Sequence, residues 1–166
     1  MGNDVEVRRA TRADAQRIAQ IYNGYVRDTV ITFETEPVPV EEMAQRIERT
    51  IARYDWLVAE SNREIVGYAY YGQFRTRAAY DHTVESTVYV AAGNMRRGVG
   101  RTLYAALMRS ARERGFREVI GVIALPNPES TALHATMGFA EAGVLKRVGY
   151  KFGAYIDVAI WQLSLA

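Results

Sequence analysis

The sequence predicts a mixed α/β fold built on one central sheet, and three observations support this prediction. The chain has 166 residues, of which 49% are hydrophobic, enough for one compact domain that we expect to span residues 1–166. Apolar runs of strand length alternate with amphipathic segments of helical length. Near the middle, the β-branched run Glu85–Val90 leads through a short loop into a glycine-bearing turn and an amphipathic helix. That order predicts a strand–helix–strand unit at the heart of the sheet.

The amino-terminal part is predicted to form an edge strand followed by two helices. Residues 5–9 alternate as an edge strand does. Thr11 and Asp14 form a variant capping box that starts a helix, which we expect to end near Tyr22. Apolar residues at helical spacing predict a second helix over residues 40–54.

A hairpin and a long helix follow. The apolar runs 56–60 and 65–71 flank a polar turn and predict two paired strands. The strand at residues 85–90 precedes a helix that we expect to end near Arg114, because Gly115 is suited to a helix carboxyl terminus.

The carboxy-terminal part is predicted to hold three strands and a short helix. Residues 119–124 read as a buried strand, and residues 129–137 as a short helix. Two final strands are expected over residues 139–145 and 156–163, separated by a glycine-rich segment.

Composition excludes several classes of protein. The net charge is only +2 and the charges are interspersed, so we expect no nucleic-acid partner. The sequence contains no cysteine, which excludes disulfides and a covalent cysteine nucleophile. No apolar stretch approaches the roughly 20 residues of a membrane span, and the start of the chain has no apolar signal region. We therefore expect a cytoplasmic protein with no membrane partner and no metal.

The turn before the long helix has the features of an anion site. A strand that runs into a helix through glycines directs backbone N–H groups and the positive end of the helix dipole at one spot. Gly98 and Gly100 allow close approach of a ligand, and Arg96, Arg97 and Arg101 add positive charge. The spacing matches neither a P-loop nor GxGxxG. A phosphate or pyrophosphate is therefore the expected ligand.

A second motif lies in the short helix and makes the pattern more specific. Asn127, Ser130, His134 and the pair Gly138-Phe139 are spaced as in the signature Asn-x-x-Ala/Ser-x-x-x-Tyr-x-x-x-Gly-Phe. Together with the glycine turn, this resembles the GCN5-related N-acetyltransferases. Two positions depart from the family pattern, because Met95 replaces a usual Gln or Arg and His134 replaces the Tyr.

The resemblance implies a single-domain fold with a largely antiparallel sheet flanked by helices, and acetyl-CoA as the co-substrate. The pantetheine arm would pair with the strand edge at residues 88–90. The residues that the resemblance and the turn assign to acetyl-CoA are Val88, Tyr89, Val90, Arg96, Arg97, Gly98, Val99, Gly100, Arg101, Asn127 and Ser130.

The resemblance narrows to the phosphinothricin and methionine sulfoximine/sulfone N-acetyltransferases. It rests on segments along nearly the whole chain, including Thr32–Pro37, Trp56–Glu60, Tyr80–Val90 and Lys151–Asp157. It implies direct transfer of acetyl to the α-amine of a small amino acid, and a homodimer.

Two residues are the candidate catalytic groups. Glu85 opens the strand beside the expected thioester and could deprotonate the amine, directly or through water. His134 could act as base, or as acid toward the CoA thiolate. The alternatives are a solvated strand carboxylate for Glu85 and a structural helix histidine for His134. A backbone N–H near Tyr89 or Val90, freed by a strand distortion, could stabilise the oxyanion.

An amino-acid substrate brings a carboxylate and a polar head, which arginine side chains bind well. Arg75 and Arg77 lie in the loop before the Glu85 strand, although a loop arginine can equally be a solvated surface charge. Tyr89, Tyr104, Met108 and Trp161 are expected in the core or an interface. The expected substrate-binding residues are Phe33, Phe74, Arg75, Arg77, Tyr80, Ser86 and Thr87.

Other functions remain open at this point. The acceptor could be a polyamine, an antibiotic amine or a peptide N-terminus, although the arginine-bearing loop favours a carboxylate. A different class is a non-catalytic acyl-CoA-binding regulatory module.

Overall fold

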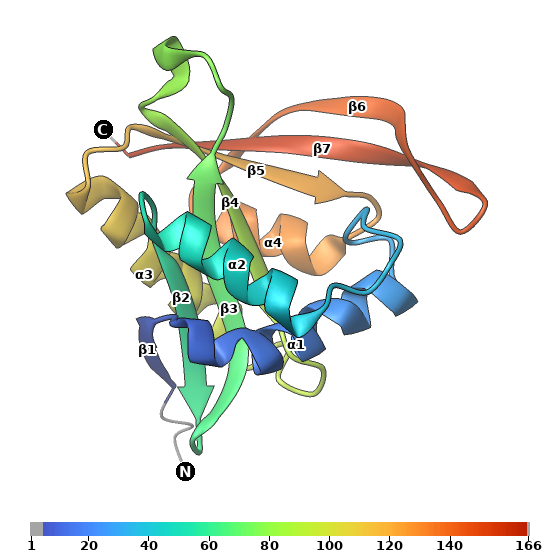
Figure 1. Cartoon of the computed structure of the whole chain (residues 1–166). Coiled ribbons are helices and arrows are strands. Elements are labelled where there is room, and N and C mark those ends of the chain that lie inside the picture. Colours follow the sequence, from blue (N-terminus) through green and yellow to red (C-terminus); the bar gives the residue numbers. More distant parts are fainter. Residues whose placement is uncertain (1–4, 166) are drawn as a thin grey trace.

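The computed structural model describes residues 5–165 and contains a seven-stranded sheet with helices on both faces (Figure 1). The strand order is β1-β2-β3-β4-β5-β7-β6, and only the β4–β5 pair is parallel. The predicted mixed α/β class is therefore confirmed. The strands are β1 (Glu6–Arg9), β2 (Trp56–Ser61), β3 (Glu64–Gln73), β4 (Thr83–Val90), β5 (Glu118–Ala124), β6 (Ala140–Lys151) and β7 (Ala154–Ser164).

Helices α1 and α2 cover one face of the sheet, and α3 and α4 lie on the other (Figure 1). Their bounds are α1 (Ala15–Asp28), α2 (Val40–Ile51), α3 (Val99–Glu113) and α4 (Pro128–Thr136), with short 3-10 turns η1 (Arg12–Asp14) and η2 (Ala78–Tyr80). None of these helices in the described part of the chain has both the length and the apolar character that a membrane crossing requires.

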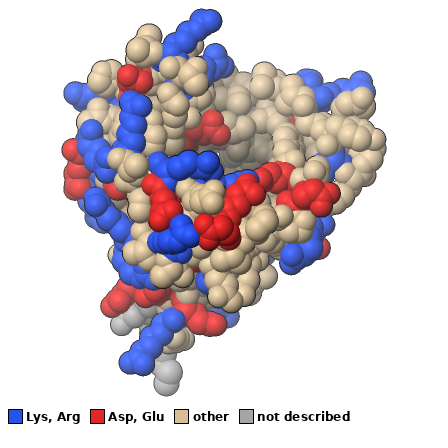
Figure 2. All heavy atoms as spheres, in the orientation of Figure 1, with Lys and Arg blue, Asp and Glu red and all other residues tan. Residues whose placement is uncertain are grey.

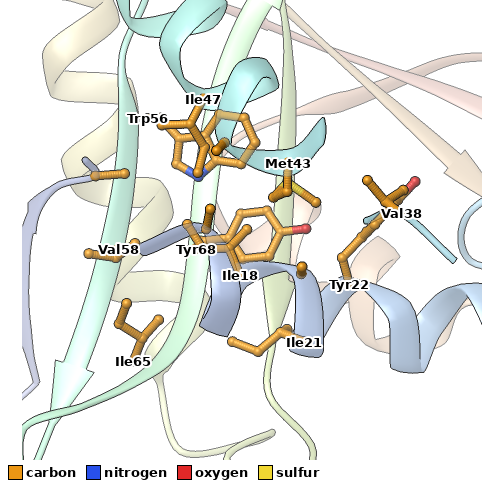
Figure 3. Packing of buried hydrophobic residues seen from close by; sticks show 14 of the residues in the cluster. Ile18, Ile21, Tyr22, Val38, Met43, Ile47, Trp56, Val58, Ile65 and Tyr68 are labelled. Atoms are coloured by element: carbon orange, nitrogen blue, oxygen red, sulfur yellow. The ribbon is translucent and has the colours of Figure 1, made fainter. Parts of the chain in front are cut away.

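The alternation of side chains in β2 shows how one sheet serves two cores. Trp56 and Val58 join the cluster under α1 and α2, where Ile18 and Ile47 are fully buried (Figure 3). Leu57 and Ala59, which alternate with them along the strand, face α3 instead. Each face of the sheet therefore buries its own helix layer, as the period of two in a strand requires.

Several element boundaries differ from the sequence prediction, and β4 begins at Thr83, so Glu85 is its third residue instead of its first. Helix α1 continues to Asp28 instead of ending near Tyr22, because Val26 is also buried against the sheet. Helix α2 ends at Ile51, three residues before the predicted end. The last two strands form one long hairpin, and residues expected to be a glycine-rich connection belong to β6.

Asp157 holds an irregular part of this hairpin together. The β6–β7 register shifts between Leu145 and Gly149, so the residues between them form an irregular bulge in β6. The Asp157 carboxylate accepts hydrogen bonds from the Arg147 backbone N–H (2.8 Å) and from Lys146 Nζ (3.0 Å). The bulge explains why an alternating pattern could not be followed through this segment.

The two central parallel strands separate along their length. Register pairs join Thr83–Ser86 of β4 to Glu118–Gly121 of β5, and no further β4–β5 pair follows. Strand β4 nevertheless continues to Val90 and β5 to Ala124, each paired on its other side. The sheet is therefore split at its centre, on the side where both strands end.

A buried carboxylate ties α3 to the sheet. Asp55 is 4% exposed and accepts hydrogen bonds from Tyr71 Oη (3.2 Å), Arg114 Nη1 (3.1 Å) and the Ser110 hydroxyl. These partners come from β3 and from the end of α3, the helix whose start lies at the predicted anion site.

We expect Asp55→Asn to lower the free energy of unfolding by about 1.5–3 kcal/mol, because the amide loses the charge that strengthens these hydrogen bonds. Urea denaturation would measure the change. Asp81→Asn is the matched control, because the Asp81–Arg53 pair is exposed and long at 3.5 Å. Its effect should stay below about 1 kcal/mol, and equal losses in both variants would contradict a special role for Asp55.

Candidate active site

A cavity of about 730 Å³ lies where β4 and β5 separate. Figure 2 shows the surface hollowed at this place, between helix α2 and the β6–β7 hairpin. Its walls come from β4 and β5, from the start of α3, from α4 and from the loop between α1 and α2. The cavity therefore reaches both faces of the sheet.

The β4 edge in this cavity carries backbone groups with no strand partner. The Ala91 N–H donates to the Val66 carbonyl on the β3 side (2.8 Å). Because successive residues of a strand point their N–H groups to opposite edges, those of Val88 and Val90 face the cavity. The β3–β4 register is uninterrupted from Val84 to Val90, so the expected strand distortion is absent. The split of the sheet exposes the edge instead, and of the two N–H groups predicted as oxyanion donors, that of Val90 faces the cavity and that of Tyr89 faces β3.

The glycine turn lies at one end of the cavity. Gly98 is the N-cap of α3 with φ +81°, a conformation that glycine adopts at no steric cost. A Cβ at Gly100 would lie 3.3 Å from Leu133 Cδ2, so glycine also allows α3 to approach α4 closely. Arg101 lines the cavity beside them. The first turn of α3 thus presents free N–H groups and positive charge to the cavity.

Three predicted cofactor residues have other environments. Arg96 lines the cavity but forms an exposed ion pair with Glu129 of α4 (3.0 Å). Arg97 is exposed and lies outside the lining. Val99 is 3% exposed and packs in the core, so only its backbone can face a ligand.

Helix α4 brings Asn127 and Ser130 to the cavity wall. Asn127 is the N-cap of this helix, and its Oδ1 accepts a hydrogen bond from the Ser130 N–H (3.1 Å). This bond satisfies one of the free donors at the helix start. The side-chain amide of Asn127 is thereby fixed at the cavity.

His134 is the buried polar side chain of α4, at 3% exposure. Its Nδ1 lies 2.7 Å from the Ser130 carbonyl, and its Nε2 lies 3.0 Å from the Tyr104 hydroxyl. The carbonyl can only accept, so Nδ1 carries the proton and Nε2 faces Tyr104 with its lone pair. Burial lowers the pKa of His134, against a smaller opposing effect of the Ser130 bond. The neutral ring is therefore favoured.

Tyr104 extends this hydrogen-bond chain to β4. Its hydroxyl lies 3.0 Å from Ser86 Oγ, and both residues line the cavity. Tyr104 is predicted to lie in the core or an interface, and it is 1% exposed in the core. The clue to this network in the sequence is that Tyr104 lies beside the apolar Leu103 in a predicted amphipathic helix, because a buried hydroxyl needs a hydrogen-bond partner.

Glu85 lies on the opposite face of β4 from Ser86 and also lines the cavity. Its carboxylate has no ion-pair partner among residues 5–165. Burial raises the pKa of the Glu85 carboxyl above its usual value. A half-buried carboxylate that holds protons more tightly is better suited to accept one from a substrate.

The structure divides the predicted substrate residues into two groups. Phe33, Ser86 and Thr87 line the cavity. The β3–β4 loop projects away from it, and the Arg75 guanidinium lies over the rings of Phe74 and Tyr80, at 5.0 and 5.5 Å from their centroids. Arg77 is exposed in the same loop. A substrate role for these four loop residues stays a prediction.

The sequence matches the acetyltransferase (GNAT) domain over residues 7–160. The chain therefore belongs to the GNAT acetyltransferase family. It contains, over the described residues, no group of three His, Asp or Glu side chains arranged to hold a metal ion.

Within this family, the chain is similar to enzymes that modify small amino acids. It is 44% identical to the phosphinothricin N-acetyltransferase of Streptomyces viridochromogenes, over 95% of this chain and 86% of that protein. It is 33% identical to the L-methionine sulfoximine/L-methionine sulfone acetyltransferase of Salmonella typhimurium, over 96% and 94%. The structure of a phosphinothricin acetyltransferase from Sinorhizobium meliloti in complex with AcCoA superimposes with a TM-score of 0.95 at 35% identity, covering 100% of this chain and 90% of that one.

Proposed function

We propose that this protein is an acetyl-CoA-dependent N-acetyltransferase that acts on the α-amine of a small amino acid such as phosphinothricin, methionine sulfoximine or methionine sulfone. The observation that carries the proposal is the split between β4 and β5. It places an unpaired strand edge, the start of α3 and the Glu85 carboxylate in one cavity. The names of the relatives support the substrate class.

The residues at the cavity fit acetyl-CoA, which supplies the acetyl thioester when bound. The start of α3 and Arg101 would hold the pyrophosphate, because free N–H groups and a guanidinium both bind phosphate oxygens. The Val88 and Val90 edge would pair with the amide groups of the pantetheine arm. Asn127 offers a further side-chain amide.

Glu85 accepts a proton from the substrate ammonium, so that the amine lone pair can attack the acetyl carbon. A backbone N–H of this edge that does not pair with the pantetheine arm donates to the carbonyl oxygen as it gains negative charge. The new C–N bond then replaces the C–S bond. The attacking nitrogen loses its second proton as the amide forms, and the departing thiolate takes up one proton, so that CoA leaves as a thiol. The Tyr104 hydroxyl, held between Ser86 Oγ and His134 Nε2, would give its proton to the thiolate and recover one from this nitrogen, directly or through water.

The test is to incubate the purified protein with acetyl-CoA and a panel of amines while following release of free thiol. The panel contains phosphinothricin, methionine sulfoximine, methionine sulfone, methionine, spermidine and an N-terminal peptide. We expect turnover of the amino acids with tetrahedral heads. Turnover of spermidine or peptide alone would show that the acceptor is a polyamine or a peptide N-terminus and would contradict the proposed amino-acid substrate. Binding of acetyl-CoA without any turnover would support a non-catalytic module.

We also propose that the protein forms a homodimer through the β6–β7 hairpin. Val148, Tyr150, Phe152 and Tyr155 are 58–63% exposed in this hairpin, an unusual concentration of large apolar side chains at a surface. The expected result is a two-copy mass by sedimentation equilibrium. The double variant Tyr150→Asp/Tyr155→Asp should sediment as a monomer, whereas a wild-type monomer would refute the proposal.

A further inference from the structure

The loop between α1 and α2 forms one wall of the cavity and is anchored from the helix side. The Thr32 hydroxyl lies 2.7 Å from the Tyr22 hydroxyl of α1. The Glu34 carboxylate binds Arg46 of α2 at 2.6 and 2.9 Å, and Tyr22 donates to the same carboxylate. These contacts fix Thr32 and Glu34 but leave the side chain of Phe33, which lies between them, 41% exposed and at the cavity.

The β6–β7 hairpin contacts the same loop from the outside through a buried ammonium group. Lys151 Nζ donates to the Thr32 carbonyl at 2.8 Å, although the two residues are 119 positions apart. Lys151 is only 3% exposed and has no carboxylate partner among the described residues. A lysine is rarely buried unless its charge is satisfied, and the Thr32 carbonyl and the Phe152 ring, whose centroid lies 5.0 Å from Nζ, are the groups that satisfy it here.

Gly149 forms the second contact between hairpin and loop. A Cβ at this position would lie 3.0 Å from Phe33 Cε1 and would overlap Cζ and Cε2 of the same ring. The backbone of Gly149 does not have a positive φ, so glycine is required here for space alone. The Phe33 ring therefore rests directly on the backbone of β6.

We propose that Gly149 and Lys151 are specificity-determining residues of the acceptor site, because together they fix where Phe33 closes the cavity. Gly149 sets the position of the ring, and Lys151 sets the position of the backbone that carries it. Neither residue lines the cavity, so both act as positioning residues through Phe33. The inference rests on the proposed function, since it assigns the Phe33 end of the cavity to the amino-acid acceptor.

The first test is Gly149→Ala, with Gly143→Ala as the matched control. Gly143 lies in the same strand, and a Cβ there would meet nothing within 4 Å. We expect Gly149→Ala to raise the KM for the acceptor about tenfold. The added methyl group would crowd the Phe33 ring and force it to shift, and the free-energy cost of such overpacking corresponds to a change of about this size. The KM for acetyl-CoA should stay within about twofold, as should both constants of the control.

A double-mutant cycle with Phe33→Ala isolates the contact. In the Phe33→Ala background the added methyl meets no ring, so Gly149→Ala should have no further effect on the acceptor KM. An equal penalty in both backgrounds would overturn the assignment of Gly149.

The second test is Lys151→Met, with Lys146→Met as control. Lys146 and Lys151 are the two lysines of the chain and both lie in β6, but Lys146 is exposed and bound to Asp157. Loss of the charged donor should raise the acceptor KM about tenfold and leave the KM for acetyl-CoA unchanged. Lys151→Arg, which keeps a donor, should restore part of the loss.

The outcomes separate this inference from the proposed function. If the wild-type protein acetylates no member of the amine panel, the proposed function fails. If the wild type is active and the Gly149 and Lys151 variants keep the acceptor KM, the inference fails alone. Equal changes in both KM values, or a change of oligomeric mass in the variants, would also overturn it, because a general structural defect would then explain the loss.

Discussion

Glu85→Gln is expected to lower kcat by about 10²–10⁴-fold, the usual contribution of a general base in a proton transfer. The amide keeps the size and burial of the side chain but cannot accept a proton from the ammonium. Thiol release with a saturating amino-acid acceptor measures the effect. Glu64→Gln is the control, because Glu64 is an exposed carboxylate of neighbouring strand β3. That variant should retain wild-type activity.

The pH profile distinguishes a base from a merely structural carboxylate. Burial raises the pKa of Glu85, so as the pH falls this carboxylate becomes protonated at a higher pH than an ordinary glutamate does. Wild-type kcat/KM should therefore fall on the acid side with a pKa above that of an ordinary glutamate, and Glu85→Gln should lose this limb. A retained limb would assign the titration to another group.

A mild effect of Glu85→Gln would have a specific meaning. If His134 can take over the proton, each single variant retains much of the activity and only the double variant loses it. Full activity of the double variant Glu85→Gln/His134→Ala would exclude both groups as the source of the proton transfer.

The parts of the fold that sequence could predict are those set by local chemistry. The hairpin of β2 and β3 was predicted, and Asn62 and Arg63 at its turn both have positive φ. Gly115, with φ +86°, follows the end of α3 as expected. In each case the backbone conformation at a few neighbouring residues decides the element.

The parts of the fold and of the site that the sequence does not predict depend on contacts between distant segments. The split between β4 and β5 leaves no mark in either strand, because each keeps a regular pattern and pairs on its other edge. The hydrogen-bond chain of Ser86, Tyr104 and His134 joins three elements, and its middle member, Tyr104, belonged to no motif. The contact of Gly149 with Phe33 likewise requires the hairpin to fold back over the loop.

Gly121→Ala is expected to break the hydrogen bond between His134 and Tyr104 while leaving the His134 side chain itself unchanged. Gly121 pairs with Ser86 across the parallel strands, and a Cβ there would lie 2.6 Å from His134 Nε2 and 2.8 Å from Cδ2. Tyr104 and Phe139 pack against the imidazole with ring centroids at 5.1 and 4.9 Å, so the ring has little room to yield. The methyl group must therefore break the bond between Nε2 and the Tyr104 hydroxyl.

Two effects of Gly121→Ala should appear together. Overpacking should lower the free energy of unfolding by about 1–3 kcal/mol, and kcat should fall by about 10²-fold if the Tyr104–His134 pair moves a proton. The smaller end of the catalytic range applies because a thiol is already a fair leaving group.

The His134→Ala background separates packing from chemistry. Removing the imidazole leaves space that the methyl group added by Gly121→Ala can occupy, so this second change should cost no further stability there and should partly restore it. Activity should remain at the level of His134→Ala alone, because the imidazole that Gly121→Ala would displace is already missing. If Gly121→Ala instead lowers stability while kcat is unchanged, His134 is a packing residue, and the proton for the thiolate must reach it by another route.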